Sequence, residues 1–148
     1  MAAGKVGDFA ALDQDPESLA LVEREQPEVQ PVCASIRSLL NGKTSFDRGF
    51  DFIYAAGLYD YLPDAIACRL TSILFGMLRS SGHLLLGNFH PDYPDAASME
   101  AILTWWLIYR DEPQMQALMS RIDSAQIHDW STFRDEHRNL VFLEMVRE

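Results

Sequence analysis

Two polar residues follow an apolar stretch in the middle of the sequence. Residues 83–89 read HLLLGNF, a near-continuous apolar run that predicts a strand buried on both faces of a parallel sheet. Asn88 and His90 stand at its carboxyl-terminal tip, where ligands bind in open α/β sheets. A histidine with an unperturbed pKa near neutrality is a candidate general base there. The alternative is that His90 caps a loop beside Pro91.

A second polar group, Tyr109 and Arg110, precedes Asp111 and Glu112. The planar guanidinium of Arg110 matches a carboxylate substrate in a bidentate fork. The alternative, which we favour, is a structural ion pair with Asp111, Glu112 or a helix C-terminus. Tyr109 and Arg110 are therefore candidate site residues, with a structural interpretation open beside the catalytic one.

Other kinds of chemistry lack a motif in this sequence. No HxxxH, HExxH or CxxC spacing is present, so no metal site is predicted. No G-x-S-x-G turn or P-loop is present either, which leaves hydrolase and nucleoside triphosphatase functions without support.

The charge balance limits the classes of partner. The 148 residues carry a formal net charge of -10, which disfavours nucleic acid and anionic membrane surfaces as partners. Cys33 and Cys68 lie in apolar segments and are predicted to be free, buried thiols. No secretory signal pattern stands at the start, so we expect a cytoplasmic protein.

The elements that must position these residues alternate along the chain. Strands are predicted over residues 8–12, 29–36, 50–57, 83–89, 125–133 and 140–146. Helices are predicted from Pro16 to Pro27, with Asp15 as N-cap, from Pro63 to the turn Ser80-Ser81-Gly82, and over about 98–122. This order predicts a single α/β domain over 1–148, with a mostly parallel Rossmann-like sheet and a C-terminal antiparallel hairpin.

Several side chains are assigned by their places in these elements. Leu19, Leu21 and Val22 are predicted to form the inner face of the first helix. Trp105 and Trp106, if helical, point about 100° apart, one into the core and the other toward a pocket or interface. Tyr59 and Asp60, just after the strand at 50–57, are further pocket candidates.

Three stretches, taken in order, resemble landmarks of the class I S-adenosylmethionine-dependent methyltransferases. They are ALDQDPESL at 11–19, DFIYAAGLYDYLPD at 51–64 and MLRSSGHLLLGNFH at 77–90. The first is similar to the end of that fold's second strand, the second to its fourth strand and loop, and the third to its fifth strand with the preceding helix and turn. The resemblance covers about residues 8–148.

The resemblance implies S-adenosylmethionine as cofactor and assigns residues to it. Asp13, with Gln14 beside it, would hold the ribose, because a carboxylate at a strand tip accepts hydrogen bonds from a vicinal diol. The adenine would lie at Ser35 and Ile36, and the methyl-donor region at Ala55 and Gly57. The residues facing a small-molecule acceptor would be Asn88, His90, Tyr109 and Arg110.

A narrower resemblance is carried by residues 88–92, Met99-Glu100 and 105–112, where the sequence reads WWLIYRDE. These are similar to a bacterial subgroup that includes hydroxy-fatty-acid methyl ester biosynthesis proteins. That likeness implies a carboxylate acceptor.

One landmark of the family has no counterpart before Asp13. The glycine-rich turn after the first strand belongs some twenty or more residues upstream, but only twelve residues precede Asp13, with Gly4 and Gly7 among them. We therefore expect the fold without its first strand and helix. Three hypotheses follow. The chain is a methyltransferase, or a shortened non-catalytic relative that binds or assembles, as a homo-oligomer through exposed strand edges. The third is that the sequence is a truncated reading frame or an excised fragment.

Overall fold

The computed structural model describes residues 7–47 and 49–148, and for residues 97, 98 and 103 the backbone alone. Gly4 lies outside the described residues. The chain divides into two compact units, Met1–Ser45 and Phe46–Glu148. The prediction of one domain over the whole chain remains a prediction, and each unit is described by itself.

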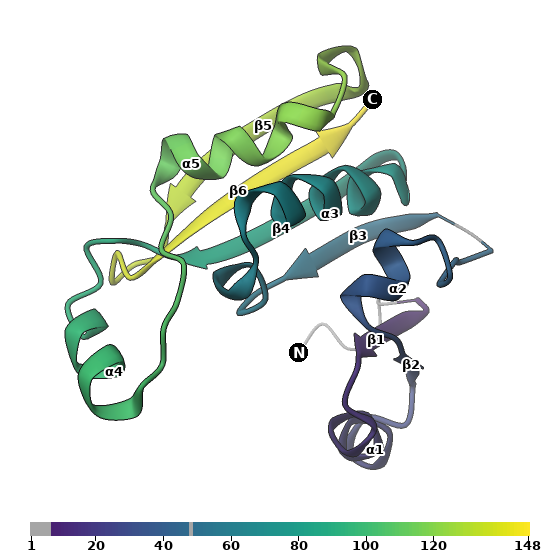
Figure 1. Ribbon diagram of the computed structural model, residues 1–148. Coiled ribbons are helices and arrows are strands. Elements are labelled where there is room, and N and C mark those ends of the chain that lie inside the picture. The colour runs from purple at the N-terminus through teal and green to yellow at the C-terminus, as the bar shows by residue number, and fades with distance from the viewer. Residues whose placement is uncertain (1–6, 48) are drawn as a thin grey trace. The chain divides into compact units, whose positions relative to one another are not determined.

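The N-terminal unit contains a strand-helix-strand arrangement, as predicted (Figure 1). Its elements are β1 (Phe9–Asp13), α1 (Pro16–Glu25), β2 (Val29–Cys33) and α2 (Ile36–Leu40). β1 and β2 pair in parallel as a two-stranded sheet. Asp15 caps α1 as expected, since its side chain accepts from the backbone N–H groups of Glu17 and Ser18.

Three expectations for this unit are wrong. Leu19 is buried in α1, but Leu21 is exposed, because ten residues of helix against two strands bury only a narrow stripe. Ile36 begins α2 and does not end β2, because Ser35 acts as an N-cap. Cys33 is a free thiol, as predicted, but it is exposed at the end of β2. In the C-terminal unit, Cys68 is free and half-buried.

The C-terminal unit is a four-stranded sheet with the strand order β3-β4-β6-β5. Its strands are β3 (Phe50–Ala55), β4 (Leu78–Phe89), β5 (Ile127–Arg134) and β6 (Leu140–Arg147). β3 and β4 are parallel, and β6 pairs antiparallel with both β4 and β5. The α/β class and the closing hairpin are confirmed. The strands form two sheets, whereas the sequence predicts one.

The helices of this unit pack on the sheet and supply its core. They are η1 (Tyr59–Tyr61), α3 (Asp64–Gly76), α4 (Ala96–Leu103), α5 (Glu112–Ala117), η2 (Leu118–Arg121) and η3 (Ser124–Gln126). α3 and α5 cover the same face of the sheet (Figure 1). Alternate residues of β4 and β6 are fully buried, as period-two strands require: Leu84, Leu86, Leu143 and Met145. No helix among the described residues is long and apolar enough to span a membrane.

The turn predicted at residues 80–82 lies within β4. α3 ends earlier, at Gly76, and β4 begins at Leu78. The extra residues are accommodated by a register shift against β3, with Ser81 at a φ of 61°. Gly82 has no room for a side chain, because an added Cβ would lie 2.8 Å from the carbonyl oxygen of Phe50.

The helix expected over about 98–122 is interrupted. α4 ends where Thr104 adopts a left-handed conformation with a φ of 50°. The next helix, α5, begins at Glu112 after its N-cap Asp111, whose side chain forms a capping box with Gln114. The segment between them is not helical, so the prediction that Trp105 and Trp106 point about 100° apart on a helix is wrong. Both tryptophans are exposed.

Candidate functional site

The carboxylate of Asp13 lies at the carboxyl end of β1, exposed to solvent. Its Oδ1 accepts a hydrogen bond of 2.9 Å from the backbone N–H of Asp15. Among the described residues no hydrogen bond reaches Oδ2, which leaves that oxygen available to a ligand hydroxyl. Gln14 is also exposed, and its carbonyl oxygen lies 3.9 Å from the thiol of Cys33.

Ser35 and Ile36 lie at the start of α2. The Oγ of Ser35 accepts from the backbone N–H of Ser38 at 3.2 Å, so this serine is first of all a helix cap. Ser38 in turn donates to the Ser35 carbonyl at 2.7 Å and contacts the hydroxyl of Thr44 at 2.8 Å. This network fixes the turn that follows β2, the position expected to hold an adenine ring.

Ala55 and Gly57 lie at the carboxyl end of β3. Ala55 is the last residue of the strand, and Gly57 has a φ of 76° in the bend that follows. A Cβ added to Gly57 would meet no atom within 4 Å. The backbone here is open to a close ligand, and the left-handed φ favours glycine at this position.

Arg110 is 1% exposed and every one of its guanidinium hydrogens is used. Nη1 donates to the Tyr59 carbonyl and to Oδ1 of Asn88, both at 2.8 Å. Nη2 donates to the Leu62 carbonyl at 2.6 Å and to Asp64 at 2.8 Å, and Nε donates to the same Asp64 oxygen at 3.2 Å. The side chain joins the loop after β3 to the end of β4, and it has no donor left for an acceptor carboxylate.

Asn88 is the polar residue on β4 that completes this network. Its Nδ2 donates to the carbonyls of Phe89 at 3.0 Å and Ile108 at 2.8 Å, while Oδ1 accepts from Arg110. Its side chain is fully buried. Asn88 and Arg110 are both expected at an acceptor site. In the structure they are in direct contact, and each also holds a backbone carbonyl of a neighbouring segment.

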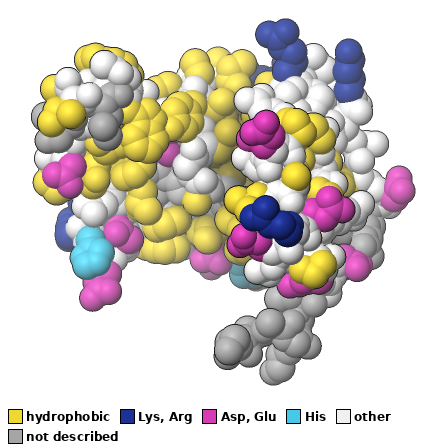
Figure 2. Space-filling view, turned by 90° about the horizontal axis from the view of Figure 1, so that it is seen from below, with side chains coloured by type: hydrophobic (Ala, Val, Ile, Leu, Met, Phe, Trp, Pro, Cys, Tyr) yellow, Lys and Arg dark blue, Asp and Glu magenta, His cyan; other side chains and the backbone are white. Residues whose placement is uncertain are grey.

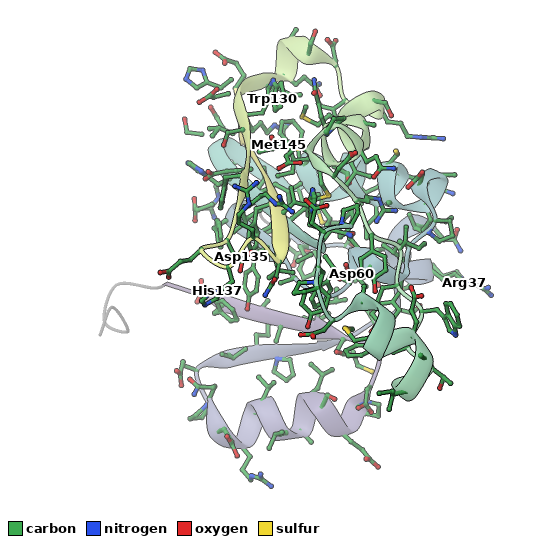
Figure 3. The ribbon with its side chains drawn as sticks, turned by 90° about the vertical axis from the view of Figure 1, so that its left-hand side faces the viewer. Arg37, Asp60, Trp130, Asp135, His137 and Met145 are labelled. Carbon is green, nitrogen blue, oxygen red and sulfur yellow. The ribbon has the colours of Figure 1, made fainter. Side chains whose placement is uncertain are left out.

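Asp60 is a buried carboxylate at the same edge of the sheet, 2% exposed. Oδ1 accepts a 2.7 Å hydrogen bond from the backbone N–H of Phe89, and the Asp60 carbonyl accepts from Ile108 at 2.7 Å. Burial raises the pKa of this carboxyl above its ordinary value of 3.8, although the Phe89 hydrogen bond and the charge of Arg110 oppose the rise. In the view of Figure 3, Asp60 is surrounded by other side chains just above α4.

Tyr109 is a half-buried residue in the segment that leads from α4 to α5. Its hydroxyl is inaccessible to solvent and has no hydrogen-bond partner among the described residues. Burial raises the pKa of this phenol above 10.0, and the charges of Glu100 and Asp60 raise it further. A buried hydroxyl without a partner costs about 1–3 kcal/mol, and the acceptor-side role of Tyr109 stays a prediction.

His90 follows β4 and is held by the loop that it begins. Its Nδ1 accepts a 3.0 Å hydrogen bond from the backbone N–H of Asp92, which assigns the ring proton of the neutral form to Nε2. Nε2 lies 3.3 Å from a carboxylate oxygen of Glu112 at the start of α5. The hydrogen bond from its own backbone N–H lowers the pKa of the Glu112 carboxyl the most, and the charges of His90 and Arg134 lower it further. The ring is thus used at both nitrogens.

The structure brings some of the expected site residues together. The four expected acceptor-side residues all lie at or after the end of β4 in the C-terminal unit. Ala55 and Gly57 lie at and after the end of β3 in the same unit. The other expected cofactor residues lie in the N-terminal unit: Asp13, Gln14, Ser35 and Ile36. Asp60, a pocket candidate from its place after the strand at 50–57, is a buried residue of the same unit as the acceptor-side residues. Asp64, the carboxylate partner of Arg110, carried no signal in the sequence because it lies 46 residues away.

Solved structures supply the comparison for this fold. A possible exported protein from Bordetella parapertussis has a TM-score of 0.76 and 18% identity, over 94% of this chain and 53% of that one. The N-methyltransferase NodS from Bradyrhizobium japonicum WM9, in complex with S-adenosyl-L-homocysteine, has a TM-score of 0.64 and 14% identity, over 95% of this chain and 66% of that one. Neither a protein-family model nor a curated protein matches the chain.

Magnesium protoporphyrin IX methyltransferase (ChlM) from Synechocystis PCC 6803, with bound S-adenosylmethionine, has a TM-score of 0.63 and 12% identity. The match covers 99% of this chain and 62% of that one. The chain thus spans between about half and two thirds of the length of these three solved structures. The strand order, the hairpin and these likenesses together show that the chain has the fold of the class I S-adenosylmethionine-dependent methyltransferases.

Proposed function

We propose that the chain takes part in methyl transfer from S-adenosylmethionine to a small-molecule acceptor. The observation that carries the proposal is the Asp13 carboxylate at the carboxyl end of β1, with one oxygen available for a ribose hydroxyl. Ligands bind at the carboxyl ends of parallel strands in this class of fold. Solved neighbours described with bound S-adenosylmethionine or S-adenosyl-L-homocysteine support the same cofactor here.

The residues present fit such a cofactor at separate points. In the N-terminal unit, the Asp13 carboxylate can accept hydrogen bonds from a diol, and the turn at Ser35 and Ile36 offers a fixed backbone beside an adenine. Gly57, in the C-terminal unit, leaves the end of β3 open, and its assignment to the cofactor stays a prediction. When bound, the cofactor supplies a methyl group already activated on a sulfonium, so the protein chiefly aligns and desolvates the acceptor.

Residues of the C-terminal unit act on the acceptor. Asp60 has the burial and the raised pKa of a general base, and the Tyr109 hydroxyl is a hydrogen-bonding group without a present partner among the described residues. Arg110 and Asn88 are positioning residues, since they fix the backbone that carries Asp60 and Tyr109. A carboxylate acceptor and a cytoplasmic location remain predictions.

The proposal is tested by isothermal titration calorimetry with S-adenosyl-L-homocysteine. We expect saturable binding, weakened about tenfold or more in Asp13→Asn, because the amide loses the charge that strengthens hydrogen bonds to a diol. Glu23→Gln, which removes an exposed carboxylate on α1, is the control and should bind as the wild type does. Absence of binding at about 1 mM ligand contradicts the proposal.

A second candidate, an assembly module, is favoured by one observation. β3 stands at the end of the strand order of its sheet and exposes 51% of Phe52. Such an edge favours pairing with another chain. Light scattering tests the assembly candidate. A monomer at all concentrations counts against assembly, and a dimer that Phe52→Lys disrupts supports assembly.

A further inference from the structure

The hydrogen bond between the His90 ring and the Asp92 backbone depends on the charge of the ring, whether or not the chain binds a cofactor. Nδ1 of His90 accepts from the Asp92 N–H at 3.0 Å, and a ring nitrogen accepts a hydrogen bond only while it carries no proton. We propose that His90 is a pH-sensitive switch: the neutral ring holds the turn at residues 90–93 closed, and a proton taken up from solvent at Nδ1 opens it.

The ring is held in place around this contact. His90 is 6% exposed, its backbone N–H donates to the Asn139 carbonyl at 2.9 Å, and its carbonyl accepts from the Tyr93 N–H at 3.0 Å. A proton on Nδ1 would place two donors face to face, because the Asp92 N–H points at the same nitrogen. Since the ring is buried and its backbone is fixed, the peptide N–H of Asp92 is the group that must turn away.

The charged groups around the ring give its protonated form new partners. In the turn, Oδ2 of Asp92 lies 3.4 Å from Nδ1, and at the start of α5, Oε2 of Glu112 lies 3.3 Å from Nε2. Arg134, at the end of β5, lies 3.4 Å from the same Asp92 oxygen and 3.8 Å from Oε1 of Glu112. The protonated ring can therefore donate to the Asp92 carboxylate in place of accepting from the Asp92 N–H.

The Asp92 carboxylate is only loosely held by its present partner. Nη1 and Nη2 of Arg134 both lie 3.4 Å from Oδ2 of Asp92, whereas N–H to oxygen hydrogen bonds ordinarily measure about 2.7–3.2 Å. The Asp92 side chain is also 74% exposed. A move of this carboxylate toward the ring therefore gives up little, because long contacts at exposed groups are weak.

The turn joins β4 to α4. The rings of Phe89 and Tyr93 lie with their centroids 5.0 Å apart, and the Tyr93 carbonyl accepts from the Ala96 N–H at 3.2 Å, where the helix begins. α4 lies where hydrophobic side chains gather at the left of Figure 2. Opening of the turn would therefore loosen the attachment of an apolar helix to the end of β4.

Nuclear magnetic resonance of the ¹⁵N-labelled chain tests the switch. At about pH 8, the ring of His90 should carry its proton on Nε2 and none on Nδ1. Hydrogen exchange of the Asp92 amide is then compared with that of an unstructured chain at the same pH, which gives its protection. Between about pH 8 and about pH 5, this protection should fall about tenfold, the loss of one hydrogen bond, with the same midpoint as the His90 ring.

Two substitutions make the test specific. His90→Asn places an amide oxygen near the position of Nδ1, and this oxygen accepts a hydrogen bond but does not titrate. The Asp92 amide of this variant should stay protected down to about pH 5. His128→Gln is the matched control, since His128 is an exposed histidine that contacts Glu148, and it should keep the fall seen in the wild type.

Three results would overturn the switch. They are a neutral His90 ring with its proton on Nδ1, an Asp92 protection that stays constant or falls with another midpoint in the wild type, and the same fall in His90→Asn. If His90→Asn does not fold, the position of the ring proton and the agreement of the two midpoints in the wild type decide the matter.

Discussion

The guanidinium of Arg110 donates to the side-chain oxygen of Asn88 over 2.8 Å, in a position where the arginine is 1% exposed. The sequence places these residues 22 positions apart, on β4 and on the segment before α5. Their contact holds the end of β4 against the loop after β3. The end of β4 and the loop after β3 are therefore joined by a buried polar network.

Arg110→Lys should destabilise the C-terminal unit by about 3 kcal/mol. Lysine has no planar fork, so Asn88 Oδ1 and the buried carbonyls of Tyr59 and Leu62 lose donors, and each unsatisfied group costs about 1–3 kcal/mol. Urea unfolding followed by circular dichroism measures the loss. Asp64→Asn is the control: its carboxylate is exposed, so the expected cost is below about 1 kcal/mol. Equal midpoints for Arg110→Lys and the wild type would show that the network adds nothing.

Tyr109→Phe should stabilise the free protein while weakening acceptor binding. The substitution removes a buried hydroxyl without a hydrogen-bond partner among the described residues and keeps the ring, so a gain of up to about 1 kcal/mol is expected. Thermal unfolding without ligand measures the gain. The matched control is Tyr59→Phe, which should destabilise because its buried hydroxyl contacts Thr71 at 3.0 Å. A lower melting temperature for Tyr109→Phe would mean that its hydroxyl has a partner in solution.

Asp60 gives stability a defined pH dependence. Its folded pKa is raised above 3.8 mainly by burial, so the folded protein holds this proton more tightly than the unfolded chain does. The resulting stabilisation is complete below the ordinary pKa and is lost as pH rises through the raised value. Asp60→Asn cannot ionise, so its unfolding free energy should rise relative to the wild type across that interval and then stay level. A difference independent of pH would show that the pKa is not raised.

Gly57→Ala should cost about 1 kcal/mol although its surroundings are open. The cost arises from the backbone, since Gly57 has a φ of 76° and an added Cβ meets no atom within 4 Å. Gly76→Ala, at the end of α3 and equally open, should instead stabilise by several tenths of a kcal/mol. Chemical denaturation of both variants compares them directly. The interpretation of Gly57 is wrong if both alanines change stability in the same direction.

Local patterns in the sequence were sufficient for much of the fold. The patterns at residues 140–146 and 83–89 identified two strands, and residues 140–146 pair with the preceding strand in the expected hairpin. Asp15 before Pro16 located a helix start to the residue. These features depend on near neighbours. The early end of α4 at Thr104 did not follow, because apolar spacing continues through the break while the backbone does not.

The chemistry of the site depended on contacts that the sequence does not encode locally. Arg110 was expected to pair with adjacent acids, yet its carboxylate partner is Asp64 at the start of α3. His90 has two interpretations from its place after a strand. The hydrogen bond that its Nδ1 accepts from the Asp92 N–H is a loop contact, and the general-base interpretation stays a prediction. Residue type and position in the sequence identified the candidate residues. Which group each donor and acceptor contacts could be seen only in the folded structure.

Nuclear magnetic resonance tests the central claim most directly, as a titration of the ¹⁵N-labelled chain with S-adenosyl-L-homocysteine. A methyltransferase cofactor site at the carboxyl ends of β1 and β2 predicts saturable shifts of the backbone amides at Asp13 and at Ser35 and Ile36. Those shifts should require a higher ligand concentration in Asp13→Asn. Shifts confined to other residues, or none at about 1 mM ligand, would contradict the claim that this chain binds the cofactor of its fold.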